Sequence, residues 1–143
     1  MAEEKHERQQ LREAVVAALL EKTAAGVRVY ASRQAPWKPG ELPGINVRTP
    51  RQAGERESLG GDMKETITLS VLAIVSLGSR SDDAADALAL EVEKAIDADT
   101  TFGGLFADAV RTGTETDLVD EQERPIGGAL LTYEVEVHTA PRT

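Results

Sequence analysis

The segment that decides the fold is KETITLSVLAIVSL, residues 64–77. Apolar and polar side chains alternate along it, which is the period of a β-strand with one buried face. The apolar face consists of Ile67, Leu69, Val71, Ala73, Val75 and Leu77. The opposite face carries Thr and Ser but also Leu72 and Ile74. The sequence therefore predicts a long strand whose second face is also partly covered.

Two helices are predicted on either side of this strand in the sequence. The first is expected over His6–Ala24, with Gly26 placed to end it. The second is expected over Arg80–Ala98, with Ser79 as its cap and acidic residues in its first turn. Each predicted helix carries one apolar stripe, in which residues recur at spacings of three and four. The first stripe is Leu11, Val15, Ala18, Leu19 and Lys22, and the second is Leu88, Val92, Ala95 and Ile96.

Further strands complete the predicted sheet. Short apolar runs indicate strands at Val27–Tyr30 and Ile45–Arg48. Longer ones are predicted at Arg111–Glu121 and Ala129–Thr139, joined by a turn that contains Pro125, Gly127 and Gly128. We expect an α+β fold, with a mixed or antiparallel sheet of four to five strands and two main helices packed on one face. The length of 143 residues fits a single domain over residues 1–143.

Two segments are predicted to be loops. Ala31–Gly44 is rich in Pro and Gly and contains Trp37, the single tryptophan of the chain. Thr49–Asp62 is polar and contains glycines, so it has little to bury and is expected to be a mobile loop or hairpin tip. Trp37 fits two readings equally, a plug over the edge of the core or a contact with a partner.

The charge of the chain excludes some classes of partner. The formal net charge is −9, which argues against general affinity for nucleic acid or for an anionic membrane. No run of about 20 apolar residues and no signal peptide is present, so the cytoplasm is the expected compartment. Residues 25–63 carry 6 basic and 4 acidic groups, whereas residues 64–143 carry 6 basic and 16 acidic groups. This imbalance is either an ordinary solvated surface or a basic segment that meets the acidic half of a neighbouring subunit.

Residue patterns that would indicate an enzyme, a metal or a cofactor are missing from the sequence. There are no cysteines, and the two histidines, His6 and His138, lie near opposite ends of the chain. The spacing of Asp97, Asp99, Thr101 and Asp108 imitates a calcium loop, but Phe102 stands where such a loop needs Gly. No phosphate-binding loop, dinucleotide fingerprint or nucleophile elbow occurs. We therefore expect no enzyme activity, no cofactor and no metal.

The candidate functional residues are instead possible contacts between proteins. Arg48, Arg51 and Arg56 give one polar segment a positive balance in an otherwise acidic chain. We expect them to face a neighbouring subunit or the inside of a closed assembly of subunits, and Trp37 is the fourth candidate contact.

The element order resembles a known family. Helix His6–Ala24 leads into a short strand, the segment ELPGINV at residues 41–47 follows, and then come the long strand, the Asp82–Ala98 helix and a final strand ending in YEVEV at residues 133–137. This arrangement resembles the tail terminator (tail completion) proteins of long, non-contractile-tailed phages, the lambda-like minor tail protein U group. The acidic run Glu115–Glu123 has no place in the family pattern.

The resemblance implies a function and a set of partners. It implies a small α+β subunit that forms a ring, usually a hexamer, caps the tail tube, ends its polymerisation and gives the head a surface to join. The partners would be further copies of the chain, the tail tube protein and a head-completion or connector protein. The protein would then reside in the virion tail, and in the host cytoplasm during assembly. Two alternatives remain, namely another neck or connector protein and a small cellular α+β binding domain.

Overall fold

The computed structural model describes residues 4–76, 81–121 and 124–142. The elements within these residues follow the predicted order. They are α1 (Glu7–Leu19), β1 (Val29–Ala31), the 3-10 helix η1 (Pro39–Glu41), β2 (Gly44–Arg56), β3 (Met63–Ser76), α2 (Ser81–Asp97), β4 (Asp108–Glu121) and β5 (Arg124–Thr139). No helix among the described residues is both long and apolar enough to span a bilayer.

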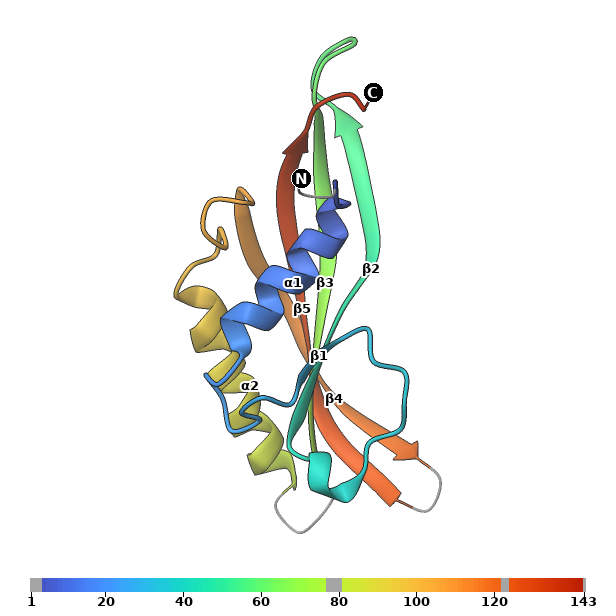
Figure 1. Ribbon diagram of the computed structural model, residues 1–143, viewed down its shortest axis with the longest axis vertical. Helices are drawn as coiled ribbons and strands as arrows, with labels where there is room; N and C mark the ends of the chain where they lie inside the picture. Colours follow the sequence, from blue (N-terminus) through green and yellow to red (C-terminus); the bar gives the residue numbers. More distant parts are fainter. Residues whose placement is uncertain (1–3, 77–80, 122–123, 143) are drawn as a thin grey trace.

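The strands form one mixed sheet in the order β1-β2-β3-β5-β4. β1 runs parallel to β2, and every other neighbouring pair is antiparallel. Both helices lie over the same face of the sheet (Figure 1). The predicted α+β fold, with a five-stranded mixed sheet and two helices on one face, is therefore confirmed. We call the opposite side the helix-free face.

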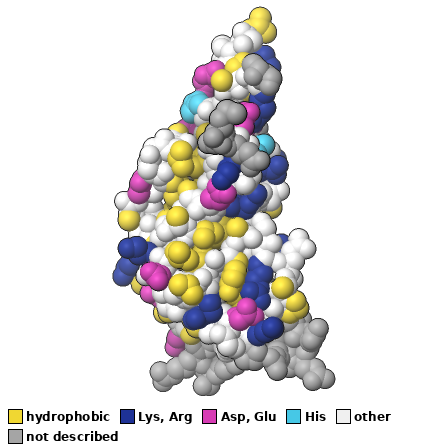
Figure 2. Space-filling model, viewed as in Figure 1, with side chains coloured by type: hydrophobic (Ala, Val, Ile, Leu, Met, Phe, Trp, Pro, Cys, Tyr) yellow, Lys and Arg dark blue, Asp and Glu magenta, His cyan; other side chains and the backbone are white. Residues whose placement is uncertain are grey.

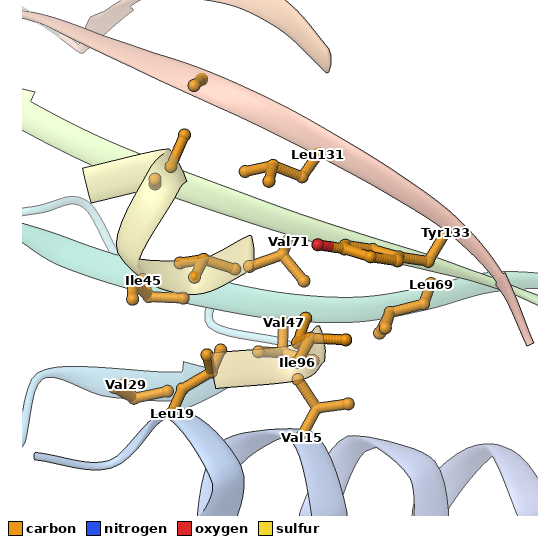
Figure 3. Close-up of a cluster of buried hydrophobic side chains, with 14 of the residues drawn as sticks. Val15, Leu19, Val29, Ile45, Val47, Leu69, Val71, Ile96, Leu131 and Tyr133 are labelled. Carbon is orange, nitrogen blue, oxygen red and sulfur yellow. The ribbon is translucent and has the colours of Figure 1, made fainter. Parts of the chain in front are cut away.

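The main core lies between the sheet and the two helices. Five of the predicted positions of the central strand are buried there, namely Ile67, Leu69, Val71, Ala73 and Val75. The sixth, Leu77, lies outside the described residues. Figure 3 shows the side chains of Val71 and Leu131 from neighbouring strands, with Ile96 of α2 and Val15 of α1 in the same buried cluster. All four are fully buried, so helices and sheet share one apolar interior.

A second, smaller cluster lies on the helix-free face. Ile74 packs there with Trp37 and Ile126, and Leu72 and Tyr30 contact the cluster from its margin. Trp37 arrives from the Pro-rich loop, which crosses this end of the sheet. The prediction that the second face of the central strand is partly covered is confirmed.

The first helix is shorter than predicted. It begins after His6, whose Nδ1 accepts a hydrogen bond from the Arg8 amide at 3.2 Å, and it ends at Leu19 rather than Ala24. Glu21 takes a left-handed conformation with φ 59° and donates its amide to the Gly26 carbonyl. This turn buries Ala25 and leaves Lys22 exposed, so Lys22 is not part of the helical stripe.

The segment Thr49–Asp62, predicted as a mobile loop or hairpin tip, is the end of the β2–β3 hairpin and is largely strand. Residues 49–56 belong to β2, and only residues 57–62 form a turn. A β-bulge between Arg48 and Arg51 accommodates Pro50, which lies where β2 has no described strand on its other side. Thr49 is buried and accepts a hydrogen bond from Arg12 of α1, which holds this part of the strand against the helix.

The predicted turn at Pro125, Gly127 and Gly128 is also strand. These residues belong to β5, and Gly127 and Gly128 pair with Val75 and Ile74 of β3. A Cβ atom on Gly128 would lie 2.4 Å from the Ala73 carbonyl oxygen, so the glycine permits close packing of the two strands. The glycine allows two backbones to lie close together here, and it does not mark a turn.

Candidate functional site

The most prominent surface feature is the hairpin of β2 and β3. Its two strands pair continuously from Arg51 opposite Thr68 to Arg56 opposite Met63. Its end projects beyond the rest of the molecule (Figure 1), and Figure 2 shows it standing clear of the body. We call residues 51–68 the arm. At its tip the side chain of Leu59 is 100% exposed.

The structure separates the three candidate arginines. The pairing of Arg48 with Ser70 and of Arg51 with Thr68 places both arginines on the helix-free face, because paired residues share a face of the sheet. Arg56 pairs with Met63 and so belongs to the other face. Arg48 donates a hydrogen bond to the Arg33 carbonyl at 2.8 Å, and within the described residues neither Arg48 nor Arg51 forms an ion pair. The positive charge of these two residues is therefore available to a partner.

Trp37 is buried within the chain, with 8% of its surface exposed. Its ring lies edge-on to the Tyr30 ring, with the centroids 5.4 Å apart. It packs on Ile74 and Ile126. This position agrees with a plug over the second face of the sheet, and contact with a partner remains a prediction.

Arg33 is the organising residue that sequence reasoning missed. Its guanidinium lies 4.3 Å from the Trp37 ring centroid and 4.7 Å from that of Tyr30. It also makes two hydrogen bonds of 2.9 Å to the Glu41 carboxylate, and this pairing raises the pKa of Arg33 and lowers that of Glu41. The signal that could have revealed it is an Arg and a Glu that bracket a Pro-rich loop. The network fixes the loop across the helix-free face.

A cavity of about 290 Å³ opens on the helix-free face beside this loop. Its floor is apolar and includes Trp37, Leu72, Ile74, Ile126 and Leu130. Arg48 and Ser70 stand at its polar rim. The cavity therefore combines an apolar floor with a hydrogen-bonding cation.

The remaining charges on the helix-free face are mainly acidic and lie toward the β4 edge. Glu134 accepts a hydrogen bond from Thr68 at 3.3 Å, and Glu136 forms a 3.1 Å ion pair with Lys64. Asp108 and Glu115 follow on β4 at positions paired with Glu136 and Leu130. The β2 side of this face thus carries Arg48 and Arg51 near the cavity and Glu55 farther along the arm, whereas the β4 side is acidic.

The two sides of the sheet that carry these charges are open edges. β1 pairs only with Ile45–Val47, so in the described structure the later residues of β2 pair with β3 alone. β4 likewise pairs only with β5 there, and its residues 110–116 are exposed. Unpaired strand edges of this kind are templates for pairing with another chain.

The possible metal sites do not assemble. No group of three or more His, Asp or Glu side chains suited to a metal ion occurs in the described parts of the chain. His138 instead lies 2.7 Å from Glu57, and His6 caps α1. Asp99 accepts hydrogen bonds from the amides of Thr101 and Gly103, so the segment that imitates a calcium loop is a capped turn.

Comparisons with known proteins find a likeness only among solved structures. No protein-family model matches the chain, and no curated protein matches it. Among solved structures, the chain is similar to one from the virion of a native gene transfer agent particle, with 17% sequence identity and a TM-score of 0.42. The match covers 91% of this chain and 90% of the other. We base the functional proposal on the sheet face, its edges and the arm.

Proposed function

We propose that this protein is a structural component of a phage or phage-like virion, and that it acts as the tail terminator. In this role a ring of copies, a hexamer by the family resemblance, occupies the end of the tail tube. The ring stops further tube subunits from adding and offers a surface to a head-completion or connector protein. Sequence resemblance suggests the role, and the open edges of the sheet are the observation that supports it most directly.

The two open edges are suited to pairing between copies. β2 is antiparallel to β3, β3 to β5 and β5 to β4, so β4 and β2 run in opposite directions. The β4 edge of one copy can therefore extend the sheet of the next copy at β2 as an antiparallel neighbour. Such a contact joins two different patches, and repeated contacts of this type close into a ring when the rotation per subunit allows it.

The charges on the helix-free face favour the same contact. It would bring Glu115 and Asp108 of one copy toward Arg48 and Arg51 of the next. Opposite charges across an interface steer association and fix its register more than they add affinity. A contact of this kind was one of the two readings of the charge imbalance in the sequence, and we propose that it is made by these strands.

A terminator needs no chemical step. It acts by covering a growing surface, so the proposal includes no catalytic residue, cofactor, metal, membrane or nucleic acid. Its affinity for the finished tube must exceed that of the next tube subunit, because otherwise the length of the tail would not be controlled. The proposed location is the virion tail, and the host cytoplasm during assembly.

One observation favours a different function. The cavity on the helix-free face has an apolar floor and converging polar groups, as expected of a small cellular binding domain. Its volume of about 290 Å³ lies just below the usual range for small-molecule sites, roughly 300–1,000 Å³. If the protein is instead another neck or connector protein, the same edges of its sheet would bind a different partner surface.

The test combines assembly with a variant at one edge. Thr114 is exposed on β4, and Thr114→Lys adds a charge of the kind that protects natural edge strands from pairing. Ala87→Lys, at an exposed position of α2, is the matched control. We expect rings and capped tail tubes in negative-stain images of the wild type and the control, and neither with Thr114→Lys.

Loss of the gene tests the functional role itself. A phage that lacks it should produce tails of abnormal length and few joined heads. Normal tails and full infectivity would rule out the terminator role and favour the cellular binding domain. Rings that form but do not bind tube ends would point to another neck protein.

A further inference from the structure

The tip of the arm presents one apolar side chain between two acidic residues. The turn is ESLGGD, residues 57–62, and Gly60 adopts φ +73°. Leu59 is fully exposed, and Glu57 and Asp62 stand on either side of it as exposed residues. A leucine in this setting has no apolar neighbour to cover it in the described chain, and its burial by a partner would be favourable.

The cavity on the helix-free face has the complementary character. It offers an apolar floor that includes Leu72, Ile74 and Leu130, with the cation of Arg48 at its rim. Arg51 lies on the same face, at the base of the arm. The volume of about 290 Å³ suits one or two side chains of a protein segment better than a typical small-molecule ligand.

We propose that the arm tip of one copy docks in this cavity of a second copy. Leu59 enters the apolar floor and the carboxylate of Asp62 meets Arg48 and Arg51. Glu57, which lies 2.7 Å from His138 of its own chain, adds to the negative charge of the tip. The tip is apolar with acidic neighbours, and the cavity is apolar with basic neighbours. Because this chain carries both complementary surfaces, another copy of it is the favoured occupant. The proposal does not depend on the virion role.

A chain cannot make this contact with itself. Ser70 at the cavity rim and Met63 at the end of the arm strand are seven residues apart on β3, which corresponds to roughly 23 Å. Leu59 lies still farther along the arm. The contact is therefore between copies, joins different patches, and places copies head to tail. It differs from pairing at the sheet edges and can join one ring or subunit to the next along the arm direction.

The absence of cysteines makes a direct cross-linking test possible. The variant with Leu59→Cys and Ser70→Cys should form disulfide-linked chains under mild oxidation. An intramolecular bond is excluded, because a disulfide needs Cα atoms within about 7 Å. The control joins Leu59→Cys with Leu90→Cys, at a half-exposed position of α2. We expect the first variant to cross-link about tenfold faster, because docking holds its two thiols together. Equal rates in the two variants would overturn the proposal.

A charge-exchange experiment tests the same contact without cysteines. Arg48→Glu and Asp62→Lys should each weaken self-association, measured by sedimentation equilibrium. A mixture of the two variants should recover it, because the altered cavity of one accepts the altered tip of the other. Leu59→Ser should weaken association by about tenfold, as expected for losing one buried leucine. Thermal unfolding of each variant verifies that it is folded, and failure of the mixture to recover association would contradict the docking geometry.

Discussion

Replacement of Glu7 by Gln should lower the free energy of unfolding at neutral pH. It should also remove part of the decrease in that free energy as the pH falls. Glu7 begins α1 and is buried, with 8% of its surface exposed. Gln52 of the arm donates a hydrogen bond to its carboxylate at 3.0 Å, and Arg142 donates from both terminal nitrogens. Burial alone would raise the pKa of Glu7, but the hydrogen bonds from Arg142 and Gln52 outweigh it and lower the pKa from 4.5 to about 2.

The size of the effect follows from this pKa. A difference between 4.5 and about 2 corresponds to at most about 3.4 kcal/mol, at 1.36 kcal/mol for each pH unit. Arg142 is more than half exposed, so solvent screens the pair, and we expect Glu7→Gln to cost about 1–2.5 kcal/mol at pH 7. Because the folded pKa is the lower one, the stabilisation is complete above pH 4.5 and is lost as the pH falls toward 2.

Urea unfolding at pH 7, 5 and 3 measures this effect. The wild type should exceed Glu7→Gln in unfolding free energy at pH 7, and the gap should narrow at pH 3. Asp86→Asn, at an exposed position of α2, is the control and should have the same unfolding free energy as the wild type at each pH. A gap that stays constant from pH 7 to pH 3, or no gap at pH 7, would refute the reasoning.

Four further predictions test the core, the arginines and the overall charge. Val71→Ala should lose about 2–3 kcal/mol in urea unfolding, because Val71 is fully buried, and wild-type stability would show the strand phase to be wrong. Tyr133→Phe should change the free energy of unfolding by less than about 1 kcal/mol, because the Tyr133 hydroxyl is buried without a hydrogen-bond partner in the described structure. A larger loss would reveal a hydrogen bond to the nearby Arg111. Changing Arg48, Arg51 and Arg56 together to Glu should weaken assembly in light scattering and leave thermal unfolding unchanged, whereas unchanged assembly would remove these residues from the interface. Sedimentation velocity should show mostly monomer at low salt and more ring at high salt, because salt screens the repulsion between copies of net charge −9. The reverse trend would mean that attraction between opposite charges dominates the association.

The sequence predicted the parts of the fold in which one physical period persists over many residues. The alternation through Ile67, Leu69 and Val71 placed the central strand and its buried face. The stripe of Leu88, Val92 and Ile96 likewise placed α2. When the apolar pattern repeats many times, every repeat identifies the same buried face. A few exceptions then do not change the prediction.

The β2 strand of the arm was missed because its alternation of apolar and polar residues is interrupted. Pro50, Gly54 and a majority of polar side chains are typical of a loop, and the bulge after Arg48 shifts the alternation. Residues 49–56 are nevertheless strand, because the neighbouring strand β3 is long enough to pair with them. The pairing partner lies elsewhere in the chain, and the pattern within the segment does not contain it.

The candidate site was predictable only in part. The positive balance that singled out Arg48 and Arg51 is visible in the sequence, but their separation from Arg56 depends on the register of the hairpin. The cavity combines side chains from the Pro-rich loop, β2, β3 and β5, which are distant along the chain. Arg33 was overlooked because its partners, Trp37 and Glu41, become neighbours only when the loop folds back.

The contact between Glu7 and Arg142 joins the beginning of the described chain to its end. Chains whose ends lie close together at the surface tolerate circular permutation, in which the old ends are linked and new ones are opened elsewhere. New ends could be opened in the arm turn, where Gly60 and Ser58 are exposed. The same closeness would let one subunit be fused to the next through a linker that starts and finishes at a single corner of each fold. A tandem polypeptide of this kind would hold the number of subunits in a ring fixed by covalent bonds, and the variants described above could then be placed in chosen positions around it.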